Sequence, residues 1–180
     1  MTTDIPIHVI WLAQDDPKKN TAVKLSRRNE LVLHERFNRL PRKGIILEPL
    51  CGKVLGPEDH PLLLQHGGSL VGLDCSWAQI ENSVSKVMEK TKLKGRMLPL
   101  LLAANPVNWG KPGKMTTAEA IAASLFLIGR EEHARRLLGA FSWGEQFFIL
   151  NKEPLLAYAD AKSSTELVNL QFEFFDIDEE

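Results

Sequence analysis

The fold is decided by a stretch near the start of the chain that reads IPIHVIWL, residues 5–12. It is an almost continuous apolar run, and it ends in the polar sequence QDDP, residues 14–17. Such a run predicts a strand buried on both faces, as strands of parallel sheets are. Two more strands are predicted over residues 44–47 and 69–74, with crossover-length segments between them. We therefore predict an α/β first half: a parallel sheet with helices on its faces.

The pattern becomes helical beyond residue 95. Ser/Thr-x-x-Glu/Gln capping boxes stand at Ser76/Gln79, Thr116/Glu119, Ser142/Glu145 and Ser163/Glu166. They predict helices near 77–92, 117–128, 143–151 and 164–175, and two glycines bracket another over 130–140. We predict an α/β domain over residues 1–95 and a mainly helical domain over residues 96–180.

Length and composition exclude several classes of protein. The 180 residues suffice for one large domain or two small ones, and 44% hydrophobic with 25% charged residues is ordinary for a globular chain. This excludes disordered, collagenous and coiled-coil proteins. The longest apolar run, residues 98–104, is too short to cross a bilayer, and the N-terminus lacks the pattern of a signal peptide. We expect a cytoplasmic protein with no membrane partner.

Cysteine and histidine usage gives no support for a metal site. Cys51 and Cys75 are not in a C-x-x-C spacing, and they are interpreted as buried free thiols. The five histidines are scattered and form no H-x-x-x-H pair. No metal is expected.

Charge is segregated along the chain although the formal net charge is only −1. Residues 17–43 carry nine Lys/Arg against two acids, residues 86–114 carry seven against one, and the last fifteen residues hold six acids and no base. This distribution is compatible with a basic face for a polyanion, and equally with ordinary solvated surfaces.

Three polar segments follow predicted strands or an apolar run, and each could be functional or merely structural. In residues 73–77, LDCSW, Asp74 ends an apolar strand, where partial burial would raise its pKa toward that of a useful base. Its structural alternative is a helix cap. Residues 15–21 lie beyond the first strand, where α/β sheets bind ligands, or form a solvated loop. Residues 103–112, AANPVNWGKP, form a ligand loop or a connection with a buried Trp.

Taken together and in this order, five segments resemble the ribosomal RNA aminocarboxypropyltransferases, which use S-adenosylmethionine (SAM). The matching segments are DPKKNT (16–21), LDCSW (73–77), RMLPLLLAANPVNWGKP (96–112), TTAEA (116–120) and FSWGEQF (141–147). The resemblance implies a SPOUT-like fold with a trefoil knot, which no periodicity would suggest.

The resemblance also implies a set of site residues. Asp74 would be the catalytic residue and Trp77 would wall a pocket for the S-methyl group. The residues that would bind the rest of the cofactor are Thr21, Leu73, Leu98, Ala103, Ala104, Asn105, Met115, Thr116 and Thr117. Those expected to contact RNA are Lys18, Lys19, Lys24, Arg27, Arg28, Lys92, Lys94 and Arg96.

The implied reaction moves the 3-amino-3-carboxypropyl group of SAM to N3 of a pseudouridine that is methylated at N1, in small-subunit rRNA or a pre-ribosomal subunit, without a metal. Asp74 would accept the N3 proton or orient the nucleobase. Two rivals stay open: a SPOUT-type methyltransferase that presents the methyl group of the same cofactor, and a ribosome-assembly factor without enzymatic activity. A structural domain without a ligand is the blandest alternative. We expect a monomer, since no exposed apolar helix face demands a partner.

Overall fold

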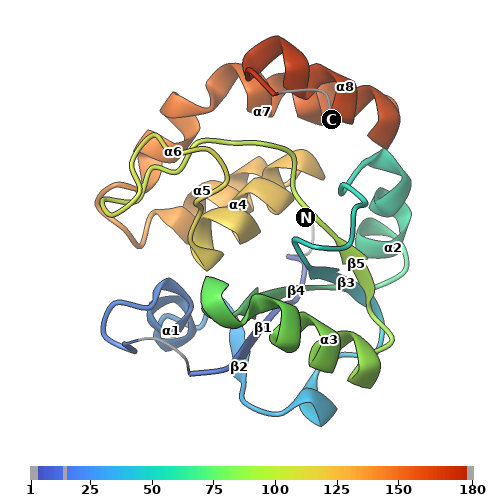
Figure 1. Cartoon of the computed structure of the whole chain (residues 1–180), viewed down its shortest axis with the longest axis vertical. Helices are drawn as coiled ribbons and strands as arrows, with labels where there is room; N and C mark the ends of the chain where they lie inside the picture. Colours follow the sequence, from blue (N-terminus) through green and yellow to red (C-terminus); the bar gives the residue numbers. More distant parts are fainter. Residues whose placement is uncertain (1–3, 14–15, 178–180) are drawn as a thin grey trace. The chain divides into compact units, whose positions relative to one another are not determined.

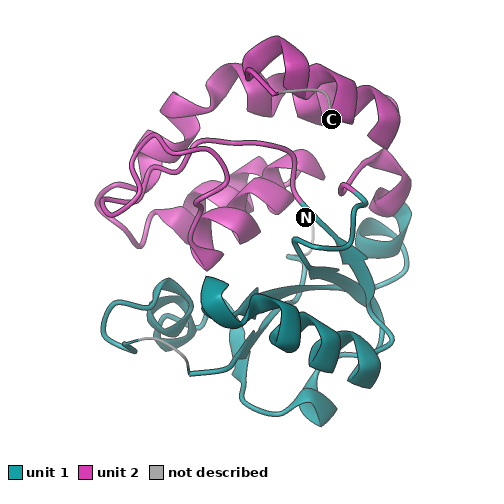
Figure 2. Cartoon of the chain, viewed as in Figure 1, with its two compact units in different colours: residues 1–53, 61–97 teal, residues 54–60, 98–180 magenta. Residues whose placement is uncertain are grey.

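The chain divides into two compact units, which Figure 2 draws in teal and magenta. Our computed structural model describes residues 4–13 and 16–177. Unit 1 comprises residues 1–53 and 61–97, and unit 2 comprises residues 54–60 and 98–180. The boundary proposed from the sequence falls two residues before the end of unit 1, but the inclusion of residues 54–60 in unit 2 was not foreseen. The predicted turn residues 14 and 15 and the last three acidic residues lie outside the described part.

Unit 1 contains a five-stranded parallel sheet in the order β2-β1-β4-β3-β5 (Figure 1). Its strands are β1 (Ile7–Trp11), β2 (Val32–His34), β3 (Gly44–Leu47), β4 (Ser69–Asp74) and β5 (Lys94–Arg96). The predicted parallel α/β architecture is confirmed, as are β1, β3 and β4. The two missed strands are the edges of the sheet. Each has only three residues, and neither VLH nor KGR forms an apolar run.

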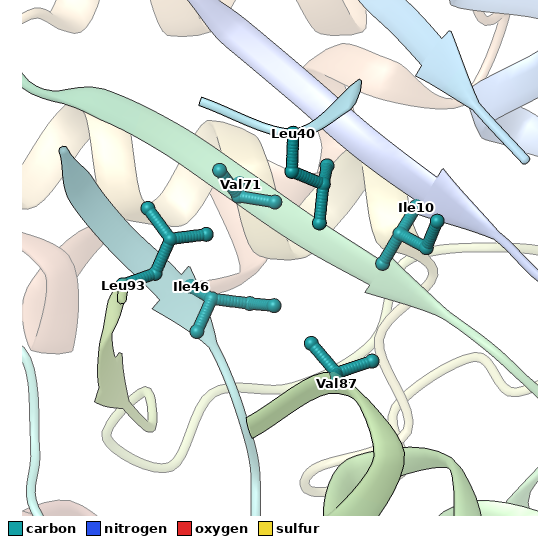
Figure 3. Close-up of a cluster of buried hydrophobic side chains, with 6 residues drawn as sticks. All are labelled: Ile10, Leu40, Ile46, Val71, Val87 and Leu93. Atoms are coloured by element: carbon teal, nitrogen blue, oxygen red, sulfur yellow. The ribbon is translucent and has the colours of Figure 1, made fainter. Parts of the chain in front are cut away.

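One face of the sheet is covered by α3 (Ile80–Lys90). Ile46 pairs with Val71 across β3 and β4, and both join Ile10 and Val87 in a buried cluster that Leu40 and Leu93 complete (Figure 3). Ile7 and Val9, which alternate with Ile10, are 4% and 0% exposed. Strand β1 is therefore buried on both faces, as its continuous apolar run predicted.

The remaining helical turns of unit 1 are short. They are α1 (Thr21–Arg27), η1 (Phe37–Arg39), η3 (Trp77–Gln79) and part of α2 (His60–Leu64). The predicted capping box at Ser76 is wrong. Ser76 precedes the 3-10 turn η3 and makes no side-chain cap hydrogen bond, and α3 begins only at Ile80.

Unit 2 is helical apart from its first segments. It contains η2 (Pro57–Asp59), α4 (Thr117–Leu127), α5 (Glu131–Leu138), α6 (Gly144–Leu150), α7 (Lys152–Asp160) and α8 (Ser164–Phe174). Caps at Thr116 and Ser163 are confirmed, whereas the predicted cap at Ser142 is wrong because Trp143 precedes α6. Helix α7 was missed because it follows α6 after Asn151 alone and has a proline in its first turn, where proline is tolerated.

Side chains of the later helices hold the apolar run 98–104 in place. Leu100 donates its N–H to Gln171 Oε1 (2.8 Å) and accepts from the Tyr158 hydroxyl (3.0 Å). Leu102 donates to Asn151 Oδ1 (2.7 Å) and accepts from Asn151 Nδ2 (2.9 Å). These bonds satisfy the backbone groups that a neighbouring strand would otherwise satisfy. Within the described residues, no helix is long and apolar enough to cross a membrane.

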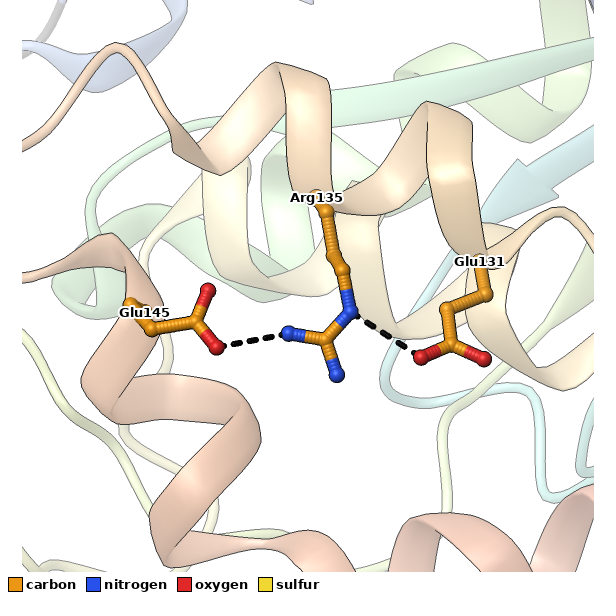
Figure 4. Close-up of polar contacts among 3 residues, drawn as sticks. All are labelled: Glu131, Arg135 and Glu145. Atoms are coloured by element: carbon orange, nitrogen blue, oxygen red, sulfur yellow. Dashed lines mark hydrogen bonds and ion pairs between the residues drawn. The ribbon is translucent and has the colours of Figure 1, made fainter.

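An ion-pair network joins α5 to α6 on the surface (Figure 4). Arg135 donates to Glu131 Oε1 (2.9 Å) and to Glu145 Oε1 (2.7 Å), and its guanidinium lies 4.5 Å from the centre of the Phe148 ring. The glutamate side chains are 52% and 63% exposed, so solvent screens both pairs.

We expect Glu145→Ala to lower the free energy of unfolding by only about 0.5 kcal/mol, because exposed pairs contribute little. Arg135→Ala should cost about 1.5 kcal/mol, because it also removes the stem and cation that cover Phe148. Urea unfolding of both variants measures which loss of unfolding free energy is larger. Glu131→Ala, which also removes one ion pair, is the matched control. A larger loss for Glu145→Ala than for Arg135→Ala would contradict this account.

Candidate functional site

Asp74 ends the central strand β4, and Asn20 fixes its carboxylate. The residue is 9% exposed, and its Oδ2 accepts a hydrogen bond of 2.8 Å from Asn20 Nδ2. Asn20 Oδ1 in turn accepts from Val23 N–H (3.0 Å), which caps α1. Because the amide oxygen is committed to the helix, the NH₂ group must face Asp74. The carboxylate is thereby held in one orientation at the carboxyl end of the sheet.

The unit 1 candidates gather around this pair of residues. Thr21 is the first residue of α1, directly after Asn20, and Leu73 precedes Asp74 in β4. Trp77 lies three residues beyond Asp74 in η3, with 56% of its surface exposed. The contact between Asn20 and Asp74 could not be foreseen, because the two residues are 54 positions apart.

Cys75, next to Asp74, is not a prepared nucleophile. Burial has the largest effect on the pKa of its thiol and raises it. A hydrogen bond with Ser83 lowers this pKa, and the nearby Asp74 charge raises it. The thiol is therefore protonated at neutral pH and a poor nucleophile. Cys51 and Cys75 are both free, but the prediction that they are buried is wrong, since each is partly exposed. No cluster of three His, Cys, Asp or Glu suited to a metal ion occurs in the described residues.

A second arrangement in unit 2 is organised by Glu119, which is 0% exposed. One of its oxygens accepts from the N–H groups of Ala104 (2.6 Å) and Asn105 (3.1 Å). The other accepts from Asn105 Nδ2 (2.9 Å) and from the N–H (2.7 Å) and hydroxyl (2.9 Å) of Thr116. A single carboxylate thus connects the end of the apolar run to the start of α4.

Apart from Leu98, the unit 2 candidates lie in the two segments that this carboxylate joins. Ala103, Ala104 and Asn105 are buried, and Asn105 also donates to Lys114 O (3.2 Å). Four candidates are partly exposed: Leu98, Met115, Thr116 and Thr117. Residues 103–105 and 115–117 are therefore brought together although nine residues separate them. The sequence signalled Glu119 only as part of a capping box, and its bonds to Ala104 and Asn105 were missed.

The loop between these segments does not fit the structural alternative, a connection with a buried Trp. Trp109 is 51% exposed, and Val107 is 83% exposed. The loop is nevertheless well ordered by hydrogen bonds, since Gly110 donates to Ala103 O (2.7 Å) and Ala103 to Lys111 O (3.0 Å). Exposed aromatic and apolar side chains on a fixed loop are typical of a binding surface.

The predicted RNA-contacting residues differ in accessibility. Seven of the eight are exposed: Lys18, Lys19, Lys24, Arg27, Arg28, Lys92 and Lys94. Arg96 is the exception, since it is 9% exposed and its guanidinium donates to Gly95 O (2.7 Å). Lys18 and Lys19 lie just before α1 and Lys24, Arg27 and Arg28 lie within it or at its end, so these five cations share one short segment of unit 1.

A histidine pair joins β1 to β2. His8 Nδ1 and His34 Nε2 are 2.8 Å apart, their rings are within 22° of parallel and the ring centres are 5.0 Å apart. The ring separation matches an edge-to-edge hydrogen bond better than face-to-face stacking. Burial lowers the pKa of both histidines, and for His8 the charge of His34 lowers it further.

These pKa shifts predict that the protein loses stability as the pH falls from about 7.5 to 5.5. Below 6.5, the unfolded histidines bind protons that the folded ones do not, so protonation favours unfolding. His60, whose pKa burial also lowers, adds a contribution of the same sign. His8→Val should therefore have a shallower dependence of unfolding free energy on pH than the unaltered chain. Equal slopes in urea titrations at several pH values would contradict this.

Comparison with known proteins places the chain among ribosome biogenesis proteins. The family described as "Ribosome biogenesis protein, C-terminal" matches residues 45–175. The 16S rRNA aminocarboxypropyltransferase of Methanosarcina mazei is 44% identical over 168 residues, which cover 93% of this chain and 94% of the relative. That of Halobacterium salinarum is 40% identical, over 97% and 99% of the two chains. Among solved structures, the SAM-dependent rRNA:acp-transferase Tsr3 from Vulcanisaeta distributa has a TM-score of 0.82 and 35% identity, covering 95% of this chain and 96% of that one.

Proposed function

Because the chain belongs to the ribosome biogenesis family that includes the 16S rRNA aminocarboxypropyltransferases, we propose that it transfers the 3-amino-3-carboxypropyl group of SAM to small-subunit rRNA. The observation that carries the proposal is the match at 44% identity over 93% of the chain to a transferase of that name. The solved relative described as SAM-dependent supports the same cofactor. The proposed acceptor is N3 of a pseudouridine that is methylated at N1.

Unit 1 supplies the group that accepts the N3 proton. Asp74 is the catalytic residue, and the hydrogen bond from Asn20 presents its carboxylate in a fixed direction. Thr21 contacts the methionine end of SAM through its backbone and Leu73 contacts the ribose. Trp77 covers the S-methyl group, and the 56% exposure of its indole in this structure leaves a surface that a ligand can cover.

Unit 2 supplies residues for the adenine. Leu98, Met115 and the segment 103–105 offer apolar atoms and carbonyl groups, while Thr116 and Thr117 begin α4, whose N-terminus favours a carboxylate. The N–H groups of Ala104 and Asn105 already donate to Glu119, so these residues contact the adenine through other atoms. Small side chains at 103 and 104 allow a ligand to approach the backbone closely.

The chemistry is an in-line displacement at carbon. SAM supplies a sulfonium that activates three carbons, and placement alone selects one of them. Asp74 accepts the N3 proton, the nitrogen bonds to the γ-carbon of the aminocarboxypropyl group, and the bond from that carbon to sulfur breaks. The electron pair of that bond stays on sulfur, so the second product is methylthioadenosine. The donor is consumed in one step, and the protein needs no redox partner.

A pair of isotopic labels tests this function. The chain is incubated with a small-subunit rRNA fragment and SAM labelled either in the methyl group or in the carboxyl carbon. We expect carboxyl label in the RNA and none from the methyl group. Methyl label in the RNA would identify a methyltransferase, and label from neither form would leave an assembly factor without this activity.

The proposal extends to backbone topology and assembly. A SPOUT-like trefoil knot is proposed from the resemblance of the five sequence segments, and the five-stranded parallel sheet of unit 1 is the part of that fold which the structure contains. A crystal structure with SAM bound would trace it. We also propose a cytoplasmic monomer, for which light scattering should give a mass near the 20.2 kDa of one chain. A mass of twice that value would overturn the monomer.

A further inference from the structure

A cavity at the edge of the unit 1 sheet is lined by none of the residues proposed above for the reaction, the cofactor or RNA contact. It has a volume of about 400 Å³ and is lined by Trp11, Leu33, His34, Glu35, Arg36 and Arg39. Trp11 is the last residue of β1, His34 is the last residue of β2, and the two arginines flank and enter the 3-10 turn η1. The lining thus combines two aromatic rings from the sheet with two cations from the loop that follows it.

The position of this cavity relates it directly to Asp74. Strands β2, β1 and β4 are adjacent and parallel, so their carboxyl ends lie along the same edge of the sheet (Figure 1). Trp11 pairs with Asp74 in the register of β1 and β4, and Leu12 donates its N–H to Asp74 O (3.1 Å). Neighbouring strands are about 4.8 Å apart, so His34 on β2 lies about 10 Å from the strand that carries Asp74.

The lining is chemically suited to one nucleotide. An indole offers a flat face on which any base can stack, and guanidinium groups pair with phosphate. His34 is held edge to edge by His8, which fixes the orientation of its ring before any ligand arrives. Arg36 and Arg39 are both exposed and outnumber Glu35, so the opening is positive overall. Base stacking combined with charge pairing is how proteins bind single-stranded RNA.

We infer that this cavity binds a nucleotide of single-stranded RNA next to the one that reacts at Asp74. The base stacks on Trp11, its phosphate pairs with Arg36 and Arg39, and His34 borders the cavity. The inference rests on the proposed function, and it adds a requirement that the RNA around the target be unpaired. Duplex RNA cannot enter, because its bases are stacked on one another and their faces are hidden.

Two variants and two oligonucleotides separate stacking from charge. The ligands are a fluorescently labelled oligouridylate and an oligonucleotide of the same length without bases. Trp11→Leu keeps apolar bulk in the half-buried position but removes the aromatic face. We expect it to weaken oligouridylate binding about 10-fold and to leave binding of the base-free strand unchanged, since stacking needs a base.

Arg36→Ala/Arg39→Ala should weaken both ligands about 10-fold through lost phosphate contacts. Its matched control is Arg42→Ala/Lys43→Ala, which removes two exposed cations of the same segment that do not line the cavity. The arginine variant should be the weaker binder by at least about 5-fold at equal salt. Since all four positions are exposed, neither variant threatens the fold, and the result stands even if Trp11→Leu is unstable.

Equal losses of oligonucleotide affinity in the arginine variant and its control would overturn the inference. So would an equal loss of affinity for the oligouridylate and the base-free strand in Trp11→Leu. Binding of uridine monophosphate that depends on Trp11, without any effect on the oligouridylate, would reassign the cavity to free nucleotides. Failure of the proposed function is recognised separately. It appears as absent carboxyl label in RNA with the unaltered chain, whatever the cavity variants bind.

Discussion

Asp74→Asn is expected to lower the rate of aminocarboxypropyl transfer about 100- to 10 000-fold, the range attributed to general-base catalysis. Asparagine has the shape of aspartate and can still accept a hydrogen bond from Asn20, so the fold and the binding of SAM should survive. The loss would then appear in the chemical step with little change in cofactor affinity. Single-turnover transfer of carboxyl label and calorimetric titration with SAM measure the two quantities.

The dependence of the variant on pH distinguishes a base from a group that only orients the acceptor. If Asp74 removes the N3 proton, hydroxide can replace it, so the rate of Asp74→Asn should rise with pH while the unaltered enzyme changes less. A variant that stays uniformly slow at every pH would indicate orientation instead. Full activity of Asp74→Asn would remove Asp74 from the mechanism. Asn20→Ala serves as the companion variant, because it leaves the carboxylate in place and removes the bond that directs it.

The sheet could be predicted where the sequence is apolar and continuous. Residues 5–12, 44–47 and 69–74 form buried strands because fully buried parallel strands need apolar side chains on both faces. The edge strands β2 and β5 carry no such requirement. Their pairing comes from the neighbouring strands β1 and β3 rather than from their own composition. Short edge strands therefore escape any reading of local hydrophobicity.

The candidate site was predictable in its parts but not in its connections. Asp74 and Thr116 stand at positions that the chain itself marks, a strand end and a helix cap. The contacts that hold these parts of the site in place are long-range. Asn20 reaches Asp74 across 54 positions, and Glu119 reaches Ala104 across 15. The capping box with Thr116 already accounts for a glutamate at position 119. Nothing in the sequence therefore indicates that its carboxylate also binds Ala104 and Asn105.

Removing the Glu119 carboxylate should produce a large loss of stability in unit 2. Glu119→Ala leaves the buried N–H groups of Ala104 and Asn105 and the partly buried N–H of Thr116 without their acceptor, and each buried group costs about 1–3 kcal/mol. We expect a loss of about 4 kcal/mol or more in the free energy of unfolding, in the range reserved for broken buried networks. Equilibrium unfolding in urea measures it.

Glu119→Gln separates the charge from the shape of this side chain. An amide keeps one acceptor oxygen but turns an NH₂ group toward donors that already point inward, so about half of the loss should remain, about 2 kcal/mol. Glu132→Gln makes the same chemical change at an exposed position of α5 and should cost less than about 0.5 kcal/mol. If Glu119→Gln were as stable as that control, the five donors would not depend on this carboxylate. In the folded fraction of Glu119→Gln, weakened SAM binding with Asp74 intact would connect the fixed backbone at 103–105 to the cofactor, independently of the chemical step.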